Sequence, residues 1–296
     1  YILALNARAH SVKYTYFDYY TLQPVHTGRF ENIGLQGTIQ LKDNSVYVLG
    51  NDLSYLDCIN YLLTSEHNIP GEQLAGIGHR IIHGGSRFKY PVLVDADTRL
   101  YLKSICNLAP SHLPQNLAAI NVCNYVLKEK VPQVGVFDTE FHSNLTEAYT
   151  RFPIPNKYFE QGIRKYGFHG IAYESIVQQI KTINPELHIN GKYIACYLGN
   201  GSSACAIEGG NSKATTMGYS SMSGMIMSMR PGDMDPQVVI EMLKDHDMDI
   251  FMLEETFYKR CGLKAISNKT HDVRHLEEAL YPEANLALVM YVNSVA

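Results

Sequence analysis

Residues 193–207, Tyr193-Ile-Ala-Cys-Tyr-Leu-Gly-Asn-Gly-Ser-Ser-Ala-Cys-Ala-Ile207, decide the predicted fold. Two β-rich runs flank a polar, glycine-rich turn, and this pattern is typical of a hairpin. Residues 1–18 have the same form, with a polar turn between two β-rich runs. When the two stretches are aligned, Ser11 lies over Ser203. Few residues are identical, but a hairpin with a polar tip opening each half indicates an internal repeat.

The rest of the chain alternates predicted strands with predicted helices. Apolar residues recur at helical spacing over residues 52–65, after a cap at Asn51 or Asp52. This alternation predicts an α/β chain. The domain boundary is expected near Asp138–Phe141, which gives an N-terminal lobe of residues 1–140 and a C-terminal lobe of residues 141–296. Further strands are expected at 75–82 and 134–137, and further helices at 115–130, 174–182, 237–243 and from Pro282.

The composition is that of a globular protein with a substantial core. The chain has 296 residues, of which 46% are hydrophobic and 18% are charged, so disorder is excluded as the main state. The formal net charge of −4 gives no basic surplus for non-specific nucleic-acid binding. No apolar run reaches the roughly 18 residues that span a bilayer, and no signal peptide is visible. Because the sequence begins with Tyr1, we expect at least an initiator methionine before it.

The six cysteines are too far apart along the chain to form a CxxC pair or a zinc-type cluster. Scattered thiols in apolar settings, such as Cys196 in Tyr-Ile-Ala-Cys-Tyr, are interpreted as reduced core residues. We therefore expect a cytoplasmic protein.

The tip of the second hairpin, Gly199-Asn-Gly-Ser-Ser203, is a candidate anion site. Its glycines allow backbone N–H groups to converge on an anion, and its serine and asparagine side chains add donors. A tight turn without any ligand explains the same five residues equally well.

Two arginines lie in otherwise apolar stretches. Arg80 lies in a predicted strand that ends at His83-Gly-Gly85, and Arg230 lies in the Met-rich stretch 229–236. A buried cation is costly unless it is paired, so a structural arginine–carboxylate pair is the simpler interpretation, with Asp233 as the partner of Arg230. Two arginines converging on one site would instead suit a transferring phosphoryl group.

A carboxylate and two histidines complete the candidates. Asp138 follows a short strand, and a carboxylate at this position is suited to accepting a proton or holding Mg²⁺. Capping a turn is the structural alternative. His169 lies between two glycines and His112 between two prolines, and such histidines are more often structural than catalytic. Four further polar residues near these motifs are interpreted as structural: Glu140, Glu174, His83 and His142.

Taken in order, these stretches resemble the acetokinase family, which includes acetate and propionate kinases. The matching stretches cover nearly the whole chain. They are residues 6–13, GHRIIHGG, APSHLPQN, FDTEFH, YGFHG, LGNGSS, TTMG, MRPGDMDP and CGLKAIS followed by DVR. The resemblance implies an α/β, duplicated ASKHA fold, as in sugar kinases, actin and Hsp70, with two lobes and a cleft between them. It also implies reversible, ATP-dependent phosphorylation of a short-chain carboxylate such as acetate or propionate, with Mg²⁺, in a homodimer.

The resemblance assigns roles to individual residues. Arg80 and Arg230 would flank the carboxylate and the transferring phosphoryl group. Asp138 would lie close to Mg²⁺ or the nucleophile, and His169 would stabilise the phosphoryl group with support from His112. In the first hairpin, Asn6 would bind the metal, and Ser11 and Lys13 would bind phosphate. In the second hairpin, the nucleotide phosphates would be bound by Gly199, Asn200 and Gly201.

The chain departs from the family in both hairpins. The family's first hairpin reads Asn-x-Gly-Ser-Ser-Ser-x-Lys, whereas here Arg8 replaces the glycine, and Ala9 and His10 replace two serines. Arg8 and His10 would bind phosphate with a different geometry. In the second hairpin, Tyr197 stands where the family usually has histidine.

The acyl pocket implied by the resemblance is lined by Ile82, Ser111, Phe168 and Ser221. The two serines replace leucine and proline of the family pattern. This change predicts an acid that is larger or more polar than acetate. Family members also continue past the position of Ala296 with a Gly-Ile-Gly-Glu-Asn-type segment that helps to hold adenosine, so we expect a truncation or absent residues there.

Two hypotheses follow. The retained Arg80, Asp138, His169 and Arg230 favour an active kinase. The altered first hairpin and the shorter C-terminal part favour a degenerate, non-catalytic paralogue that binds carboxylate or phosphate ligands.

Overall fold

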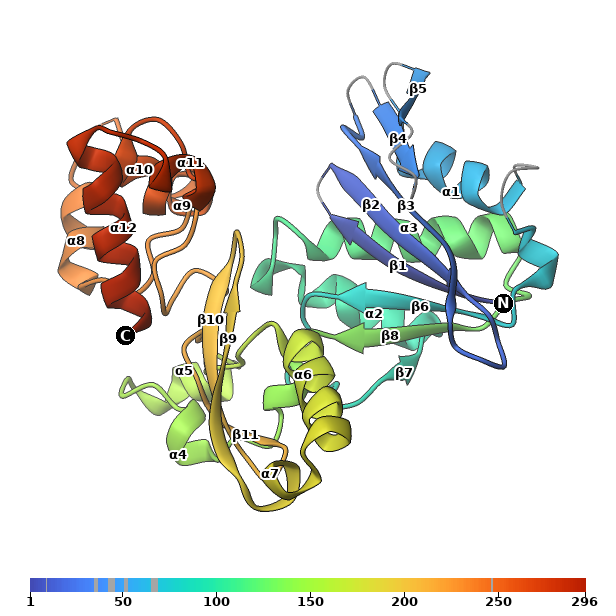
Figure 1. The fold of residues 1–296 in the computed structure, drawn as a ribbon, viewed down its shortest axis with the longest axis horizontal. Coiled ribbons are helices and arrows are strands. Elements are labelled where there is room, and N and C mark those ends of the chain that lie inside the picture. The colour runs from blue at the N-terminus through green and yellow to red at the C-terminus, as the bar shows by residue number, and fades with distance from the viewer. Residues whose placement is uncertain (9, 35–36, 42–45, 51–52, 65–68, 246) are drawn as a thin grey trace. The chain divides into compact units, whose positions relative to one another are not determined.

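The computed structural model describes residues 1–296 apart from residues 9, 35–36, 42–45, 51–52, 65–68 and 246 (Figure 1). The chain divides into two compact units, Tyr1–Glu140 and Phe141–Ala296. Each unit is described by itself.

Unit 1 is built on an eight-stranded mixed sheet with the order β5-β4-β3-β2-β1-β6-β8-β7. Strands β1, β6 and β8 are parallel, and the other neighbours are antiparallel. The strands are β1 (Ile2–Arg8), β2 (Ser11–Phe17), β3 (Pro24–Glu31), β4 (Gly37–Leu41), β5 (Val46–Gly50), β6 (Gly76–Ile81), β7 (Val92–Leu93) and β8 (Gln133–Phe137).

The first three strands separate an apolar face from a charged face, because side chains alternate along a strand. Leu3, Leu5 and Val12 are almost fully buried and form the core with residues from the helices. On the opposite face, Asn6 pairs with Lys13, and Lys13 pairs with Arg29 on the next strand. This polar face carries the candidate residues of the first hairpin.

Helices α1 and α3 contribute to the same apolar core. Cys58 and Leu62 of α1 and Cys123 of α3 are inaccessible to solvent, and the Tyr16 hydroxyl donates to the Leu62 carbonyl at 2.7 Å. The helices of unit 1 are α1 (Tyr55–Thr64), α2 (Ala96–Ser104) and α3 (Leu113–Leu127), with 3-10 turns η1 (Gly71–Gln73) and η2 (Cys106–Leu108).

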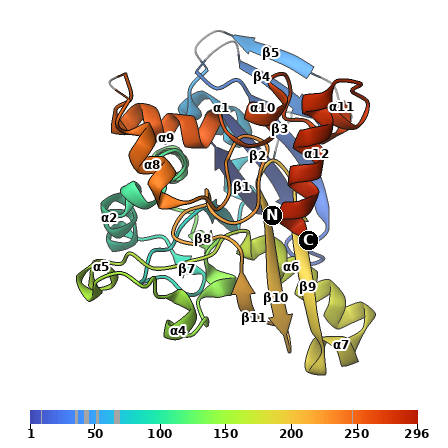
Figure 2. The same ribbon diagram turned by 90° about the vertical axis from the view of Figure 1, so that its left-hand side faces the viewer.

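Unit 2 contains the second predicted hairpin. Strands β9 (Lys192–Leu198), β10 (Ser202–Glu208) and β11 (Asn211–Thr215) form an antiparallel sheet with β10 in the middle (Figure 2). Helix α6 (Gly170–Ile183) packs on this sheet through Tyr173. The same core contains Val177 of the helix and three residues of the sheet, Ala195, Cys205 and Ile207.

A second, helical core lies in the C-terminal part of unit 2, where α10, α11 and α12 bury Leu263, Leu276 and Ala287. The Tyr291 hydroxyl of α12 lies 3.0 Å from Ser202 Oγ, so a hydrogen bond connects this helix to the second hairpin. The other elements of the unit are η3 (Glu140–His142), which begins on the last residue of unit 1, and α4 (Glu147–Thr150), α5 (Asn156–Glu160), α7 (Pro185–Asn190), α8 (Pro236–Met242), α9 (Ile250–Lys259), α10 (Gly262–Ser267), α11 (Val273–Glu277) and α12 (Pro282–Val295).

Most predicted elements are present with boundaries that shift by a few residues. Both hairpins form, although α4–α7 precede the second hairpin within its unit. The helix predicted at 52–65 begins at Tyr55, and its proposed caps Asn51 and Asp52 lie outside the described residues. Strand β3 was not predicted because Pro24 and Gly28 weaken its sequence signal, and its pairing with β2 fixes it.

The interpretation of all cysteines as core residues is wrong for Cys196, which is exposed on the edge strand β9, whereas Cys58, Cys123 and Cys205 are buried. All six thiols are free. None of the helices that the structure describes is both long and apolar enough to cross a membrane.

Candidate active site

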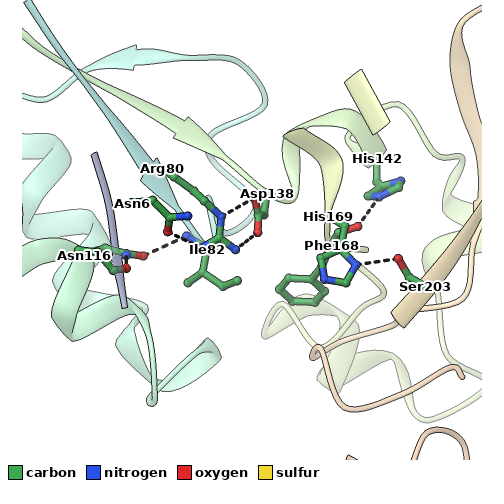
Figure 3. Close-up of polar contacts among 10 residues, drawn as sticks. Asn6, Arg80, Ile82, Asn116, Asp138, His142, Phe168, His169 and Ser203 are labelled. Atoms are coloured by element: carbon green, nitrogen blue, oxygen red, sulfur yellow. Dashed lines mark hydrogen bonds and ion pairs between the residues drawn. The ribbon is translucent and has the colours of Figure 1, made fainter. Parts of the chain in front are cut away.

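The candidate residues form one cluster in each unit. In unit 1, the guanidinium of Arg80 lies between Asn6 and Asp138 (Figure 3). Its Nε donates to Asp138 Oδ1 at 3.1 Å, its Nη2 donates to Asp138 Oδ2, and its Nη1 donates to Asn6 Oδ1 at 3.1 Å. The topology explains this arrangement, because β1, β6 and β8 are parallel and Arg80 and Asp138 lie at the same edge of the sheet.

The ion pair is nearly buried. The Asp138 side chain is 3% exposed and that of Arg80 is 23% exposed. Burial raises the pKa of the Asp138 carboxyl, and the positive charges of Arg80 and Arg8 oppose that rise. The structural pair considered for Arg80 is therefore present. It uses three of the five guanidinium N–H groups, so two further N–H groups can bind an anion.

The tip of the first hairpin adds positive charge at the same face. Arg8 pairs with Ser11 across the turn, and both Arg8 and Lys13 are exposed. His10 is turned toward the loop that follows β3, because its Nδ1 donates to the Ile33 carbonyl at 3.1 Å. Ala9 lies outside the described residues. A phosphate role for this hairpin stays a prediction.

The beginning of α3 holds the strand ends of unit 1 in place. Asn116 is buried, its Oδ1 accepts from the Ile82 amide at 3.0 Å, and its Nδ2 donates to the Ala7 carbonyl at 2.9 Å (Figure 3). Sequence reasoning missed Asn116, although it ends one of the matching stretches. His112 is the residue before α3, and both it and Ser111 are half-buried.

In unit 2, the segment that carries His169 has an unusual backbone. Gly167 and His169 both have positive φ, 75° and 62°, and a Cβ at Gly167 would lie 2.6 Å from the His142 ring. His142 Nε2 donates to the Phe168 carbonyl at 3.0 Å, and its Nδ1 accepts from Ser212 Oγ at 2.8 Å. Burial lowers the pKa of His142 to about 4, so the ring is neutral near pH 7. The structural interpretation of His142 fits this geometry.

The ring of His169 is fixed from two sides. Its Nδ1 lies 2.8 Å from Ser203 Oγ (Figure 3), which in turn lies 2.5 Å from the Tyr173 hydroxyl. The ring of Tyr197 lies against it, with 4.2 Å between centroids. Ser203 was expected at the hairpin tip as an anion donor. It lies instead within β10, fully buried, and its hydroxyl is used by His169 and Tyr173.

Arg230 approaches His169 over the second hairpin. A Cβ at Gly201 would lie 2.8 Å from Arg230 Nη2 and 3.2 Å from His169 Nε2, so both groups face the same point above the Gly201 backbone. Arg230 Nη1 donates to the Ser221 carbonyl at 2.5 Å. Burial lowers the pKa of Arg230, and the neighbouring Tyr258 opposes that change.

The expected partnership of Arg230 with Asp233 is wrong. Asp233 Oδ1 accepts from the Gly224 amide at 2.8 Å, and in the described part of the chain Arg230 forms no salt bridge with a carboxylate. The contact with Ser221 goes through the backbone carbonyl, so replacing the serine side chain leaves this contact possible.

Of the remaining tip residues, Gly199 and Asn200 are exposed, whereas Ser202 is fully buried at the start of β10. Gly199 and Asn200 lie in the turn between β9 and β10. The Asn200 carbonyl accepts from the Ser228 amide at 3.2 Å, which anchors the turn to the loop that carries Arg230.

The predicted site residues thus divide between the two units. Phe168, which is 2% exposed, and Ile82, which is 6% exposed, lie in different units, so the acyl pocket stays a prediction. Unit 1 contains Asn6, Ser11, Lys13, Arg80, Ile82, Ser111, His112 and Asp138, and unit 2 contains Phe168, His169, Gly199, Asn200, Gly201, Ser221 and Arg230.

Comparison with known proteins gives consistent matches along the chain. Residues 1–296 match the model of the acetokinase family. An acetate kinase of Methylocella silvestris is 32% identical over 98% of this chain and 76% of its own length. The structure of a propionate kinase from Francisella tularensis matches with a TM-score of 0.91 and 31% identity, over 99% of this chain and 77% of that one. Porphyromonas gingivalis acetate kinase matches with a TM-score of 0.86 and 27% identity, over 98% and 76%. The chain therefore spans about three quarters of the length of these relatives.

Proposed function

The chain belongs to the acetokinase family, and from that membership we infer that it transfers a phosphoryl group between ATP and a short-chain carboxylate. It is a kinase with a carboxyl group as the acceptor. Its fold is the α/β ASKHA fold of its structural neighbours, as the sequence predicts. Nothing in the comparisons favours the non-catalytic alternative.

We propose that His169 and Arg230 bind the transferring phosphoryl group. The observation that carries this proposal is that His169 Nε2 and Arg230 Nη2 face one point above the Gly201 backbone. Phosphoryl transfer needs little covalent help from the protein, and positioned donors and cations supply most of the catalysis. The backbone of Gly199 and Asn200 would bind the nucleotide phosphates next to this point.

In unit 1, we propose that Arg80 orients the substrate carboxylate. Two N–H groups of its guanidinium are not needed for Asn6 and Asp138, and a guanidinium fork matches a carboxylate. Asp138 would hold this fork in place, with the exposed cations Lys13 and Arg8 attracting phosphate oxygens. The units Tyr1–Glu140 and Phe141–Ala296 would be the N-terminal and C-terminal lobes.

Mg²⁺ is the cation that the family implies, and the oxygens of Asn6 and Asp138 fit its chemistry. Magnesium usually takes one or two carboxylates together with phosphate and water. Both oxygen-bearing side chains are held by Arg80, and the described residues contain no group of three acidic, histidine or cysteine side chains that could hold a metal. Mg²⁺ would therefore arrive with ATP or ADP, whose phosphates supply further oxygens, and it would neutralise charge on them. His112 would support the phosphoryl group as the resemblance implies.

The acid specificity follows from the proposed pocket of Ile82, Ser111, Phe168 and Ser221. Each buried methylene of a substrate contributes about 0.8 kcal/mol, roughly fourfold in specificity. We therefore expect propionate or a hydroxylated short acid to equal or exceed acetate in kcat/KM. The experiment measures ADP formation with Mg-ATP and acetate, propionate, butyrate or glycolate. Changing Ser111→Leu together with Ser221→Pro should shift the preference toward acetate. A strong acetate preference that the double change leaves unaltered would refute this pocket.

Two further proposals concern the whole protein. Its thiols are free, and a chain of the acetokinase family with free thiols suits the reducing cytoplasm. A homodimer is the proposed assembly, and light scattering across a concentration series tests it. A constant monomer mass would contradict the homodimer.

A further inference from the structure

Two buried hydroxyl groups form a chain that ends at Nδ1 of His169. Ser203 Oγ lies 2.8 Å from His169 Nδ1 and 2.5 Å from the Tyr173 hydroxyl. Both Ser203 and Tyr173 are fully buried. Tyr173 follows His169 by one turn of α6, and Ser203 comes from β10, so packing of the helix on the sheet fixes all three groups.

The direction of the protons in this chain follows from the acceptor that the buried phenol can reach. The Tyr173 hydroxyl is fully buried and keeps its proton, because burial raises its pKa, so that proton needs an acceptor inside the protein. Ser203 Oγ is the acceptor that the structure gives for that proton. The Ser203 hydroxyl then has its own proton available for His169 Nδ1. The opposite direction would leave a phenol proton buried without this acceptor, which is unfavourable.

An imidazole nitrogen that accepts a hydrogen bond carries no proton, so the neutral ring is protonated on the other nitrogen. His169 Nε2 would therefore carry the proton. Nε2 faces the point above Gly201 that Arg230 Nη2 also faces. A protonated Nε2 donates to a phosphoryl oxygen, whereas the other tautomer would present a lone pair to it.

We propose that Ser203 and Tyr173 are positioning residues, which form a buried hydroxyl relay from Tyr173 through Ser203 to His169 Nδ1 and hold His169 as the Nε2–H tautomer beside Arg230. Both side chains are fully buried, so neither would touch the substrate. The catalytic consequence rests on the proposed function, in which His169 binds the transferring phosphoryl group. The tautomer itself does not depend on that function, so the two can be tested separately.

The first test is ¹⁵N NMR of the full chain labelled at histidine, recorded near pH 8, with the His169 signals assigned by their loss in His169→Gln. We expect the parent to show a protonated Nε2 and an unprotonated Nδ1. Tyr173→Phe removes only the phenol hydroxyl and should produce a mixture of tautomers, and Ser203→Ala should do the same. A parent ring protonated on Nδ1, or a Tyr173→Phe ring that keeps the parent tautomer, would overturn the relay.

The second test measures kcat and KM of the same variants with Mg-ATP and a short acid. Tyr173→Phe should lower kcat about tenfold or more while each KM stays within about twofold. Tyr149→Phe is the matched control, because that phenol also lies in unit 2 and exchanges two hydrogen bonds with the Thr215 backbone, at 2.8 and 2.9 Å, and not with Ser203 or His169. An equal loss of kcat in both variants would overturn the relay's catalytic role. A parent with the predicted tautomer but no kinase activity would leave the relay standing and refute the proposed function.

Discussion

Adding a single methyl group at Gly201 should lower kcat while leaving the stability of this protein nearly unchanged. In Gly201→Ala, the new Cβ would lie 2.8 Å from Arg230 Nη2 and 3.2 Å from His169 Nε2. Ordinary carbon contacts lie near 3.5–4.0 Å, so the end of the Arg230 side chain must move by roughly 0.7 Å or more. The φ of Gly201 is not among the positive values, so alanine causes no backbone strain there.

Misplacing a catalytic group by about 1 Å costs about 100-fold in rate, which corresponds to about 2.7 kcal/mol in the activation free energy. We therefore expect kcat of Gly201→Ala to fall about 100-fold. The free energy of unfolding should change by less than about 1 kcal/mol, because the flexible end of Arg230 can move aside.

The control is Gly76→Ala in β6, outside the proposed site, where a Cβ would lie 3.6 Å from the Pro132 carbonyl and 3.9 Å from the Pro132 ring. These are ordinary contacts, so kcat should stay within about threefold. The assay measures steady-state ADP formation, and urea unfolding measures stability. Full activity in Gly201→Ala, or the same loss in both variants, would refute the placement of His169 and Arg230 over Gly201.

Other substitutions test the ion pair and the buried histidines. Arg80→Ala should abolish most activity and also destabilise the fold by about 3–5 kcal/mol, because it leaves Asp138 buried without its partner. Adding Asp138→Asn to this variant should restore stability but not turnover. Urea unfolding of the single and double variants measures the change in stability. Burial lowers the pKa of His79, His83 and His142 from 6.5 to about 4. The unfolded chain therefore takes up protons first as the pH falls, so stability is present above about pH 6.5 and is lost toward pH 4, by about 2 kcal/mol per histidine at pH 5. The free energy of unfolding should fall less between pH 7 and pH 5 in His142→Gln than in the parent, and equal decreases would contradict this origin.

The sequence predicts the elements that local pattern determines. Both hairpins, the strand that carries Arg80 and the helix from Pro282 form where the spacing of apolar and turn residues indicates them. Strands β4 and β5 of unit 1 could not be predicted, because pairing of β4 with β3 and of β5 with β4, rather than their own composition, places them. The exposure of Cys196 was also missed, because only the fold shows which face of β9 is covered: Ile194, Cys196 and Leu198 share one face and all three are exposed.

The candidate site likewise contains residues that the sequence identifies and residues that only the fold identifies. The motif residues Arg80, Asp138 and His169 stand out by type and by resemblance. Their supporting partners do not, because serine, tyrosine and asparagine are common residues with many roles. Only the packing of α6 on β10 shows that Ser203 serves His169 rather than an anion at the turn. In the same way, only the fold shows that Arg230 contacts the Ser221 carbonyl and not Asp233.

The central claim is that this chain transfers a phosphoryl group from ATP to a short carboxylate. The most direct measurement is ³¹P NMR of the full chain with Mg-ATP and propionate or acetate, which follows ATP, ADP and the acyl phosphate together. We predict an acyl phosphate that appears in equal amount with ADP, and ATP formation when acyl phosphate and ADP are supplied instead. His169→Gln should suppress both directions. Binding of ATP and the acid without any acyl phosphate, or ADP released with inorganic phosphate alone, would contradict the account.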